Sequence, residues 1–507
     1  MINFCLKKFI TFLHFILEYQ KHVLSLHLQK KYIMNMKVVN IEEYTNPTGD
    51  PFADVGGYAM KEFAERSPTK SLMDLIAEVT QIYVGNWGAK INPFFLNSKI
   101  TQPAFDAKKK TEETMKYFQS LLDGTAEHIT GFCRITGKET KLFVAGRDNS
   151  ILSGSGGFVN FHHAFEKGIM LSKEALLRFH FVPVACQLLQ GRIALIHSSD
   201  PYLTDFFARK NVSKNLWNIA SGTSSSEGIL KSECRAPGTA VFRFVDEIIS
   251  NANNKMTQSN PSLTLYHFTN FGASPEVKIY TIPSILFDFY NFTQRGEYRK
   301  QWNSFVSKYY SNSEYKGARL NNTTGKMELN KKGEITEIES KDYMNWSNVI
   351  YNRILNDQSI IPHIRKWSEK EKFNFKIVEI YQKNIRSMKQ ETIEKIKEMT
   401  DFIFDANKDN PHGIVKAIKK LNGVKNGYLL RRFVIRDIVA KFYEAEQEKE
   451  TAIITVEEYA EYLFPDSGSW SEMRDVLLIA IYQRLHEENM KVELPSDDNE
   501  DEQVENE

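Results

Sequence analysis

The sequence is poor in the residues that cross-link a chain, bind zinc or anchor a protein in a membrane. Its 507 residues include four cysteines, Cys5, Cys133, Cys186 and Cys234, and no two of them form a C-x-x-C pair. This spacing indicates neither a disulfide framework nor a complete zinc site, so we expect no metal cofactor and a reducing, cytoplasmic location. No stretch reaches the roughly 18 apolar residues of a membrane helix, so no membrane partner is expected.

Signatures of common enzymes are also missing. The pairs Gly137-Lys138 and Gly325-Lys326 lack the other residues of a phosphate-binding loop, and neither a His-Asp pair nor H-E-x-x-H occurs. His162 and His163 are the best remaining catalytic candidates, because adjacent imidazoles can bind a metal or carry a proton. The sequence therefore favours a protein that is not an enzyme. A metal-dependent nuclease or phosphodiesterase that uses His162 or His163 is the alternative.

The composition is that of a globular protein with a mildly basic body. Hydrophobic residues make up 42% and charged residues 25%, and the length indicates roughly two to four domains. Lys and Arg number 65 against 64 Asp and Glu, but residues 497–507 contain seven carboxylates and no base. Without these residues the net charge rises from +1 to +8, which permits a polyanion as partner.

Helical and strand-like patterns alternate along the chain and predict an α+β fold. We expect a non-native or dispensable extension over 1–36, a mixed α/β body over 37–345, a helical bundle over 346–488 and a disordered acidic tail over 489–507. In the body, the patterns predict helices over 71–85 and 172–190, strands over 141–145, 158–161 and 192–197, a hairpin within 264–281 and a polar loop over 321–341. In the bundle, they predict helices over 375–404, 412–421, 428–446, 456–463 and 471–487.

Three short segments carry the most distinctive pattern: T-G-D-P-F-A-D-V-G at 48–56, N-S-K-I-T-Q-P at 97–103 and I-A-L-I-H-S-S-D-P at 193–201. The sequence here resembles the large subunit of type I-B CRISPR interference (Cascade) complexes, in the subfamily named for a pair of C-x-x-C motifs. Members of that family open with a T-G-(D/N)-P-F-x-D-x-G turn, followed by a helix and an N-S-x-x-T-Q-P segment. The resemblance covers about residues 45–215 and extends more loosely to 488.

This chain departs from the family at its cysteines, because the first C-x-x-C survives only as Cys133 and no second pair is found. We expect that packing has replaced the metal. The resemblance implies a non-catalytic subunit that recognises a short motif beside the target, while guide RNA pairing reads the target sequence. The partners it implies are CRISPR RNA, the backbone, small-subunit and other Cascade proteins, double-stranded target DNA and a separate helicase-nuclease. A scaffold that contacts only protein is a further alternative.

A donor-rich stretch after two phenylalanines suits DNA binding in the first part of the chain. Amides can bond base edges and lysines can neutralise phosphates, and the glycines Gly56-Gly57 would allow close approach of the backbone. The predicted DNA-binding residues of this region are Asn97, Ser98, Lys99, Thr101, Gln102, Lys108, Lys109 and Lys110. The plain alternative is a surface turn followed by a solvated helix face.

A second basic segment lies in the helical region, where residues 411–436 contain seven bases and no acid. Lys416, Lys419 and Lys420 recur at steps of three and four and therefore share one helix face, along which phosphates could lie. With Arg431 and Arg432 they complete the predicted DNA-binding set, against the alternative of a solvated face. By contrast, His197-Ser-Ser-Asp200 contains the residue types of a catalytic triad but is more typical of a strand end and a helix cap.

Overall fold

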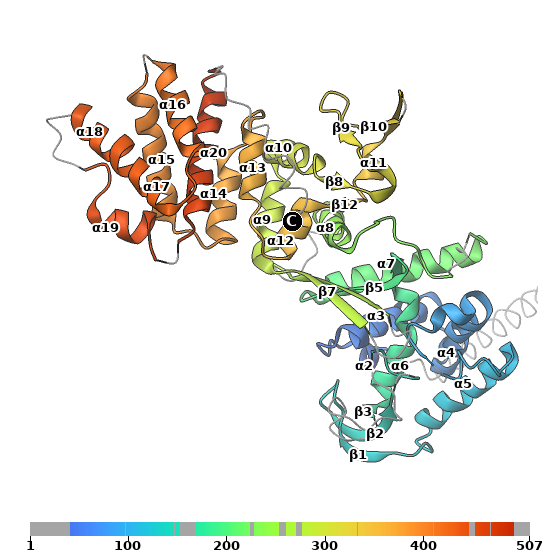
Figure 1. The fold of residues 1–507 in the computed structure, drawn as a ribbon. Coiled ribbons are helices and arrows are strands. Elements are labelled where there is room, and N and C mark those ends of the chain that lie inside the picture. Colours follow the sequence, from blue (N-terminus) through green and yellow to red (C-terminus); the bar gives the residue numbers. More distant parts are fainter. Residues whose placement is uncertain are drawn as a thin grey trace, which may run out of the picture. The chain divides into compact units, whose positions relative to one another are not determined.

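The computed structural model describes residues 41–96, 98–146, 148–152, 168–223, 228–252, 260–269, 276–331, 333–408, 410–445, 452–466 and 468–490. These residues form many helices and four small sheets, so the predicted α+β class is confirmed (Figure 1). The chain divides into two compact units. The first contains the described residues up to Glu233 and most of the hairpin up to Tyr280, and the second contains 234–249 and the described residues from Thr281 onward. The expected boundary after residue 345 falls inside the second unit.

The first unit is built around helix α3 (Pro51–Arg66), which packs against α6 (Lys173–Phe181), α7 (Pro201–Ala220) and strand β5 (Arg192–Ser198). A four-stranded sheet has the order β4-β5-β6-β7, with β4 at Gln187–Leu189, β6 at Leu263–Thr269 and β7 at Glu276–Ile282. β5 and β6 run antiparallel with Leu195 opposite Tyr266. The strand at 192–197 and the hairpin are therefore where the sequence pattern places them.

Other elements of the first unit surround this centre. They are α2 (Glu42–Thr45), α4 (Leu72–Gln81), η1 (Ile82–Trp87), η2 (Gly88–Ile91), α5 (Ala107–Leu122), β1 (Ile129–Phe132), β2 (Glu139–Ala145), β3 (Ile169–Ser172) and η4 (Pro183–Ala185). The helix expected over 172–190 ends at Phe181, because Pro183 starts a short 3-10 turn before β4. The strand expected over 158–161 lies outside the described residues.

The second unit begins with helices and short strands. Its first elements are α8 (Pro237–Glu247), α9 (Ser284–Thr293), α10 (Gly296–Ser307), β8 (Tyr310–Ser311), α11 (Ser340–Tyr343), β12 (Ser347–Asn348) and α12 (Val349–Leu355). The prediction of a loop over 321–341 was wrong: β9 (Arg319–Leu320), β10 (Met327–Lys331) and β11 (Glu334–Ile338) form a three-stranded antiparallel sheet. Met327, Leu329 and Ile338 are buried there, which the polar composition of the segment obscured.

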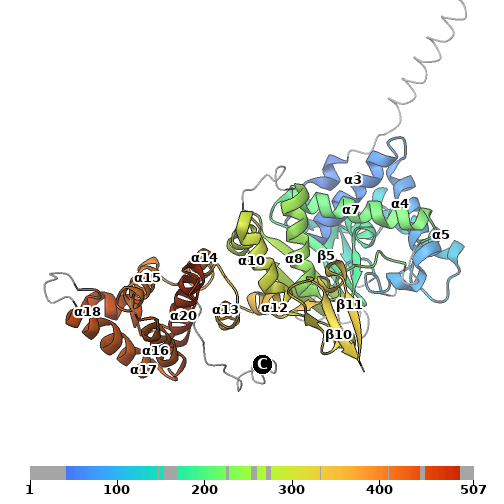
Figure 2. The ribbon, with the colours of Figure 1, turned by 90° about the horizontal axis from the view of Figure 1, so that it is seen from above.

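The remainder of the second unit is helical, as predicted. It contains α13 (Ile361–Ser368), α14 (Phe375–Asn384), α15 (Gln390–Asp405), α16 (Pro411–Asn422), α17 (Gly427–Phe433), η8 (Val434–Val439), α18 (Ala440–Ala445), α19 (Val456–Glu458), η9 (Tyr459–Leu463) and α20 (Trp470–Glu487). α20 is the central helix and contacts α13 to α17 (Figure 2), so apolar side chains are buried around its whole circumference. The single helix expected over 375–404 is two helices, separated at Ser387, whose φ is +57°. None of the helices within the described residues is long and apolar enough to cross a membrane.

Candidate nucleic-acid interface

The signature at 48–56 forms the start of α3. Asp50 is the N-cap and accepts a hydrogen bond from the Ala53 amide at 2.7 Å, and Pro51 occupies the first helical position, where no amide donor is needed. The expected turn therefore ends at residue 50, and Phe52 to Gly56 are already helical. The helical part of the segment, Ala53 to Gly56, is buried, whereas Gly49 is exposed and the other residues are partly exposed.

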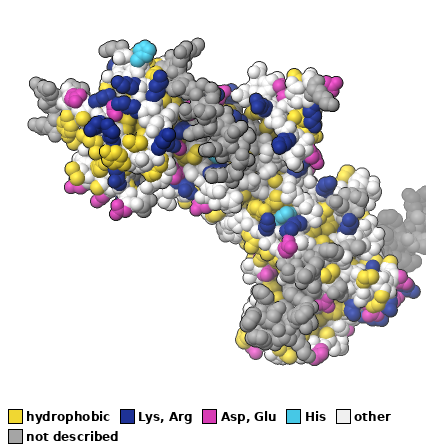
Figure 3. All heavy atoms as spheres, viewed as in Figure 1, with side chains coloured by type: hydrophobic (Ala, Val, Ile, Leu, Met, Phe, Trp, Pro, Cys, Tyr) yellow, Lys and Arg dark blue, Asp and Glu magenta, His cyan; other side chains and the backbone are white. Residues whose placement is uncertain are grey.

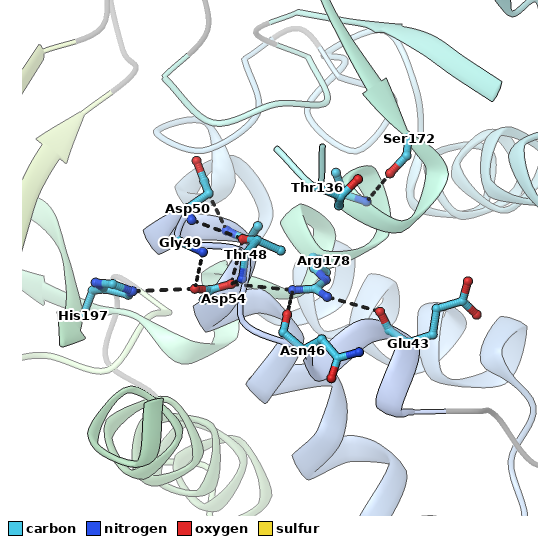
Figure 4. A network of polar contacts seen from close by, with 12 residues as sticks. Glu43, Asn46, Thr48, Gly49, Asp50, Asp54, Thr136, Ser172, Arg178 and His197 are labelled. Carbon is cyan, nitrogen blue, oxygen red and sulfur yellow. Dashed lines mark hydrogen bonds and ion pairs between the residues drawn. The ribbon is translucent and has the colours of Figure 1, made fainter. Parts of the chain in front are cut away.

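Asp54 is the centre of a buried polar network (Figure 4). Its carboxylate accepts hydrogen bonds from the Thr48 amide and hydroxyl, both at 2.7 Å, and from the Gly49 amide at 3.1 Å. His197 Nε2 lies 3.7 Å away and an Arg178 guanidinium nitrogen 3.6 Å away. Burial alone would raise the pKa of Asp54, but the neighbouring His197 ring and the hydrogen bonds from Thr48 and Gly49 outweigh it and lower the pKa.

Arg178 ties the N-terminal segment of the first unit to α6. Its side chain is 2% exposed, and its guanidinium donates to the carbonyl oxygens of Asn46 at 2.9 Å and Glu43 at 3.2 Å. Burial lowers the pKa of Arg178, opposed by the neighbouring Asp54 carboxylate. A buried cation is stable only when such partners are present, so this network holds the fold together.

Gly56 and Gly57 serve helix packing, which corrects their expected role beside a ligand. A Cβ atom at Gly56 would lie 2.0 Å from the Arg178 carbonyl oxygen, and one at Gly57 would lie 2.2 Å from the Tyr44 carbonyl oxygen. Both distances are far below van der Waals contact, so only glycine lets α3 approach α6 and α2 this closely. The two glycines thus allow close contact between α3 and the backbone of α6 and α2, and not contact with a ligand.

The turn at 98–102 separates the predicted contact residues into inward and outward groups. Ser98 and Thr101 are buried, their hydroxyls lie 3.1 Å apart, and Thr101 Oγ1 donates to the Phe95 carbonyl oxygen at 2.9 Å. Lys99 is exposed and Gln102 is partly exposed. Asn97 lies outside the described residues. Within the described part of the turn, Lys99 and Gln102 are the side chains that face solvent.

Lys108, Lys109 and Lys110 occupy the first turn of α5, where Asp106 is the N-cap and accepts from the Lys109 amide at 2.7 Å. Lys108 and Lys109 are exposed, and the Lys108 side chain is 85% exposed with Glu112 3.9 Å away. The Lys109 ammonium lies over the Phe105 ring at 4.4 Å. The three lysines therefore stand near the turn at 98–102 in sequence, on a helix that also carries acids.

A more strongly charged surface lies on α16 to α18. We name it the basic helical face and define it as Lys416, Lys419, Lys420, Lys425, Arg431, Arg432, Arg436 and Lys441, all of which are exposed. On α16, Ile414, Ile418 and Leu421 are buried, which turns the lysines outward. Figure 3 shows Lys and Arg side chains gathered over this part of the molecule.

Asp437 is the only carboxylate between residues 411 and 441. It accepts from Lys420 Nζ at 2.6 Å and lies 3.5 Å from Lys441 Nζ, while the Arg431 guanidinium lies over the Phe464 ring at 5.3 Å. Tyr428, 71% exposed, stands on the same stretch of chain. One carboxylate offsets only a fraction of eight cations, so the face keeps a strong positive charge suited to phosphates.

The described residues do not place three His, Cys, Asp or Glu side chains where they could hold a metal ion. Cys133 is buried and accepts hydrogen bonds from the Ser172 and Thr136 amides. Burial raises the pKa of its thiol, but these hydrogen bonds outweigh it and lower the pKa, whereas burial alone raises the pKa of Cys186. His162 and His163 lie outside the described residues. The expectation that zinc is absent stays a prediction.

The segment His197 to Asp200 is a strand end and a helix cap, as predicted. Asp200 is the N-cap of α7 and accepts from the Tyr202 amide at 2.9 Å. The sequence reasoning missed that His197 faces Asp54, because the two residues are distant in the chain and only the packing of β5 on α3 brings them together. It also missed Lys441, although the basic pattern continues to that residue.

Residues 365–506 match the family model described as the DevT C-terminal domain. That family name is associated with Cascade, so the match is consistent with a CRISPR large subunit and does not distinguish subtypes. It begins in α13 and includes the whole basic helical face. No curated protein matches the chain.

Proposed function

We propose that this chain is a non-catalytic large subunit of a CRISPR RNA-guided interference complex. Two independent regions support the proposal: the C-terminal match to a Cascade-associated family and the resemblance carried by 48–56 and 97–103. From that resemblance we propose type I-B as the subtype and the cytoplasm as the location. The proposed partners are the CRISPR RNA, the backbone, small-subunit and other Cascade proteins, and target double-stranded DNA.

The observation that carries a nucleic-acid role is the basic helical face. Eight exposed cations with one carboxylate among them form a surface that can neutralise phosphates and release the counterions condensed on a nucleic-acid backbone. Lysines and arginines that contact phosphates do not distinguish base sequences, since the phosphate groups are the same at every nucleotide. We therefore assign this face to binding of a nucleic-acid backbone.

In the first unit we assign Lys99 and Gln102 to contact with the short flanking motif, and Lys108, Lys109 and Lys110 to the phosphates beside it. An amide side chain such as Gln102 can pair with a base edge, and Lys99 can bond an acceptor in the groove or a phosphate. Docking of a separate helicase-nuclease is proposed from the resemblance alone.

The proposal is tested by changing Lys416, Lys419 and Lys420 together to Glu and measuring binding of duplex and single-stranded DNA over a range of salt concentrations. We expect the variant to bind all sequences more weakly, by at least about tenfold at low salt, and to show a shallower dependence of affinity on salt, because fewer counterions are released. Co-purification of the tagged chain with a small RNA and other subunits tests the complex directly.

The matched control changes three exposed lysines that are scattered over the chain, Lys278, Lys316 and Lys341, to Glu. It alters the net charge by the same amount without touching the basic helical face. If the control weakens DNA binding as much as the test variant, or if neither changes the salt dependence, the face is a solvated surface and the proposed nucleic-acid role is wrong.

A further inference from the structure

The basic helical face carries far more positive charge than its own carboxylate neutralises. Asp437 pairs with Lys420 at 2.6 Å and with Lys441 at 3.5 Å, and within the described residues the other six cations of the face have no ion pair with a carboxylate. Eight cations and one carboxylate leave a charge of +7 on this face. Like charges on neighbouring helix turns repel one another, so a bound polyanion lowers the free energy of the face.

The chain itself contains a segment of the opposite charge, residues 497–507, which we name the acidic segment. It has seven carboxylates and no base, so its charge of −7 equals that of the face in magnitude. Val504 is its one apolar residue, which leaves electrostatic contacts as its means of binding a surface. The acidic segment lies outside the described residues. The family match over 365–506 includes the face and all of this segment except its last residue.

The acidic segment follows a helix that packs against the basic helices, because α20 contacts both α16 and α17 (Figure 1). Near the start of α20, Arg474 donates to the Val424 carbonyl oxygen at 2.9 Å, just after α16 ends. Near its end, the Arg484 guanidinium lies over the Phe404 ring at 4.7 Å, a few residues before α16 begins. α16 therefore runs antiparallel to α20, and the described chain ends at Met490 on the side where α16 begins.

The chain after Met490 is long enough to reach the face. Residues 491–496 span up to about 20 Å when extended, and the twelve residues of α16 form a helix about 18 Å long. The acidic segment adds up to about 36 Å, more than the roughly 28 Å from the start of α17 to the end of α18. A short tether gives an effective concentration on the order of mM, so weak individual ion pairs suffice for the segment to occupy the face.

We propose that the acidic segment binds the basic helical face of its own chain and competes there with the phosphate backbone of a nucleic acid. Carboxylates and phosphates both accept from lysine and arginine, so one set of cations serves both ligands. The contact follows from the charges on this chain, whereas its effect on nucleic acid rests on the proposed function. Exposed ion pairs are each weak, so a long nucleic acid with its dense charge displaces the segment and a short accidental contact does not.

The first experiment neutralises part of the acidic segment and measures binding of the full-length chain to a random-sequence duplex at low salt. The test variant changes four carboxylates to amides: D497N, D498N, E500Q and D501N. We expect it to bind about three- to tenfold more tightly than the wild type, because the face is then accessible in a larger fraction of molecules. In a chain that already carries Glu at 416, 419 and 420, the same four changes should give no such gain, since the segment has lost its site.

The matched control makes the same change of net charge elsewhere on the molecule. It replaces with glutamine four exposed glutamates outside the face, Glu127, Glu233, Glu297 and Glu334. We expect this control to tighten binding by less than about twofold, through the general field of the protein. A control that tightens binding as much as the test variant would contradict the proposal, because net charge alone would then account for the effect.

The second experiment detects the contact in the absence of nucleic acid. A carbodiimide joins a carboxylate to a lysine that touches it, and mass spectrometry of the monomer identifies the pair. We expect cross-links from the acidic segment to the lysines of the face, and few to the exposed Lys316 and Lys341 of the same unit. The cross-links should disappear at about 1 M salt, where charges are screened beyond about 3 Å, and should decrease when duplex DNA is added.

The possible failures are distinguishable. Equal cross-linking of the face and the control lysines, or cross-links found only between two copies of the chain, would overturn the intramolecular contact and leave the proposed function standing. Cross-links to the face together with an unchanged DNA affinity of the test variant would rule out the competition. If neither the wild type nor the test variant binds any nucleic acid at low salt, the proposed function and the competition are both wrong, and the cross-links still report whether the segment contacts the face.

Discussion

The start of α3 and the basic helical face use charged residues in opposite ways. The segment 48–56 is the most motif-like in the sequence, yet its Asp54 is 5% exposed and its charge is satisfied by Thr48, Gly49, Arg178 and His197. The basic helical face has no recognisable motif, yet all eight of its cations are exposed. A distinctive string of residues can thus mark a structural constraint, whereas a plain excess of one charge can mark a binding surface.

The difference follows from desolvation. A buried carboxylate is tolerable only where several donors meet it, so both the residues and their spacing are fixed by geometry. Exposed lysines that face phosphates need only the right sign and the right side of a helix.

The largest effect is expected from Asp54→Ala, which leaves Arg178 buried without its carboxylate. Removal of one partner from a buried pair costs about 3–5 kcal/mol of the free energy of unfolding. The control is Asp437→Ala in the basic helical face, where Lys420 and Lys441 lose a surface partner and the cost should stay below about 1 kcal/mol. Urea unfolding of the three proteins measures both values, and similar losses in the two variants would contradict the contrast.

A second test uses glycines. Gly56→Ala places a methyl group 2.0 Å from the Arg178 carbonyl oxygen, so α3 and α6 must separate at a cost of about 1–3 kcal/mol or more. Gly85→Ala is the control, because a Cβ atom there meets nothing within 4 Å, and it should be neutral or slightly stabilising. Thermal unfolding distinguishes the two. An unchanged melting temperature for Gly56→Ala would show that the helices are not so closely packed.

The pH dependence of stability tests the buried histidine of the first unit. The pKa of His180 is about 3 in the folded protein, whereas an unfolded chain takes up that proton near pH 6.5. The unfolded state therefore binds more protons below pH 6.5, and stability falls as the pH falls, by about 1.4 kcal/mol per unit for this one group.

His180→Phe should reduce the slope of the unfolding free energy against pH by the contribution of one proton between about pH 6 and pH 4. His363 in the second unit, whose pKa is about 4 because burial lowers it, provides the comparison, since its own slope should persist in the variant. Urea unfolding at several pH values measures the slope, and an unchanged slope would mean that His180 is protonated in the fold.

The smallest effects are expected at the turn, where neighbouring residues should separate stability from binding. Ser98→Ala removes a buried hydroxyl that accepts from the Thr101 amide, at a cost of about 1 kcal/mol and no direct loss of DNA binding. Gln102→Ala should leave stability unchanged and reduce the preference for DNA with the correct flanking motif. Calorimetry and competition binding check the two. Equal losses on motif-bearing and random DNA would reduce Gln102 to a non-specific contact.

The local patterns of the sequence predicted much of the fold because they report on nearest neighbours. The capping box at Ser71 and Asp74, the cap at Asp200 and the apolar positions of α16 each depend on residues within a few positions of one another. The sheet at 319–338 was missed because its strands are polar on their exposed sides and depend on partners across the sheet. Likewise, the break between α14 and α15 at Ser387 could not be predicted, because the segment contains neither proline nor glycine.

Helical periodicity and net charge depend only on the order of the residues, so the mixed class, the helical C-terminal region and the one-sided charge of 411–436 could be predicted from the sequence. Which polar residues face inward depends on tertiary packing. Asp54 meets Arg178 and His197 because α3, α6 and β5 pack together from distant parts of the chain. Ser98 and Thr101 are buried, and their hydroxyls are paired within the turn that follows Phe95. A small pocket lined by Phe95, Phe118 and His180 also depends on tertiary packing, since these residues are distant in the sequence.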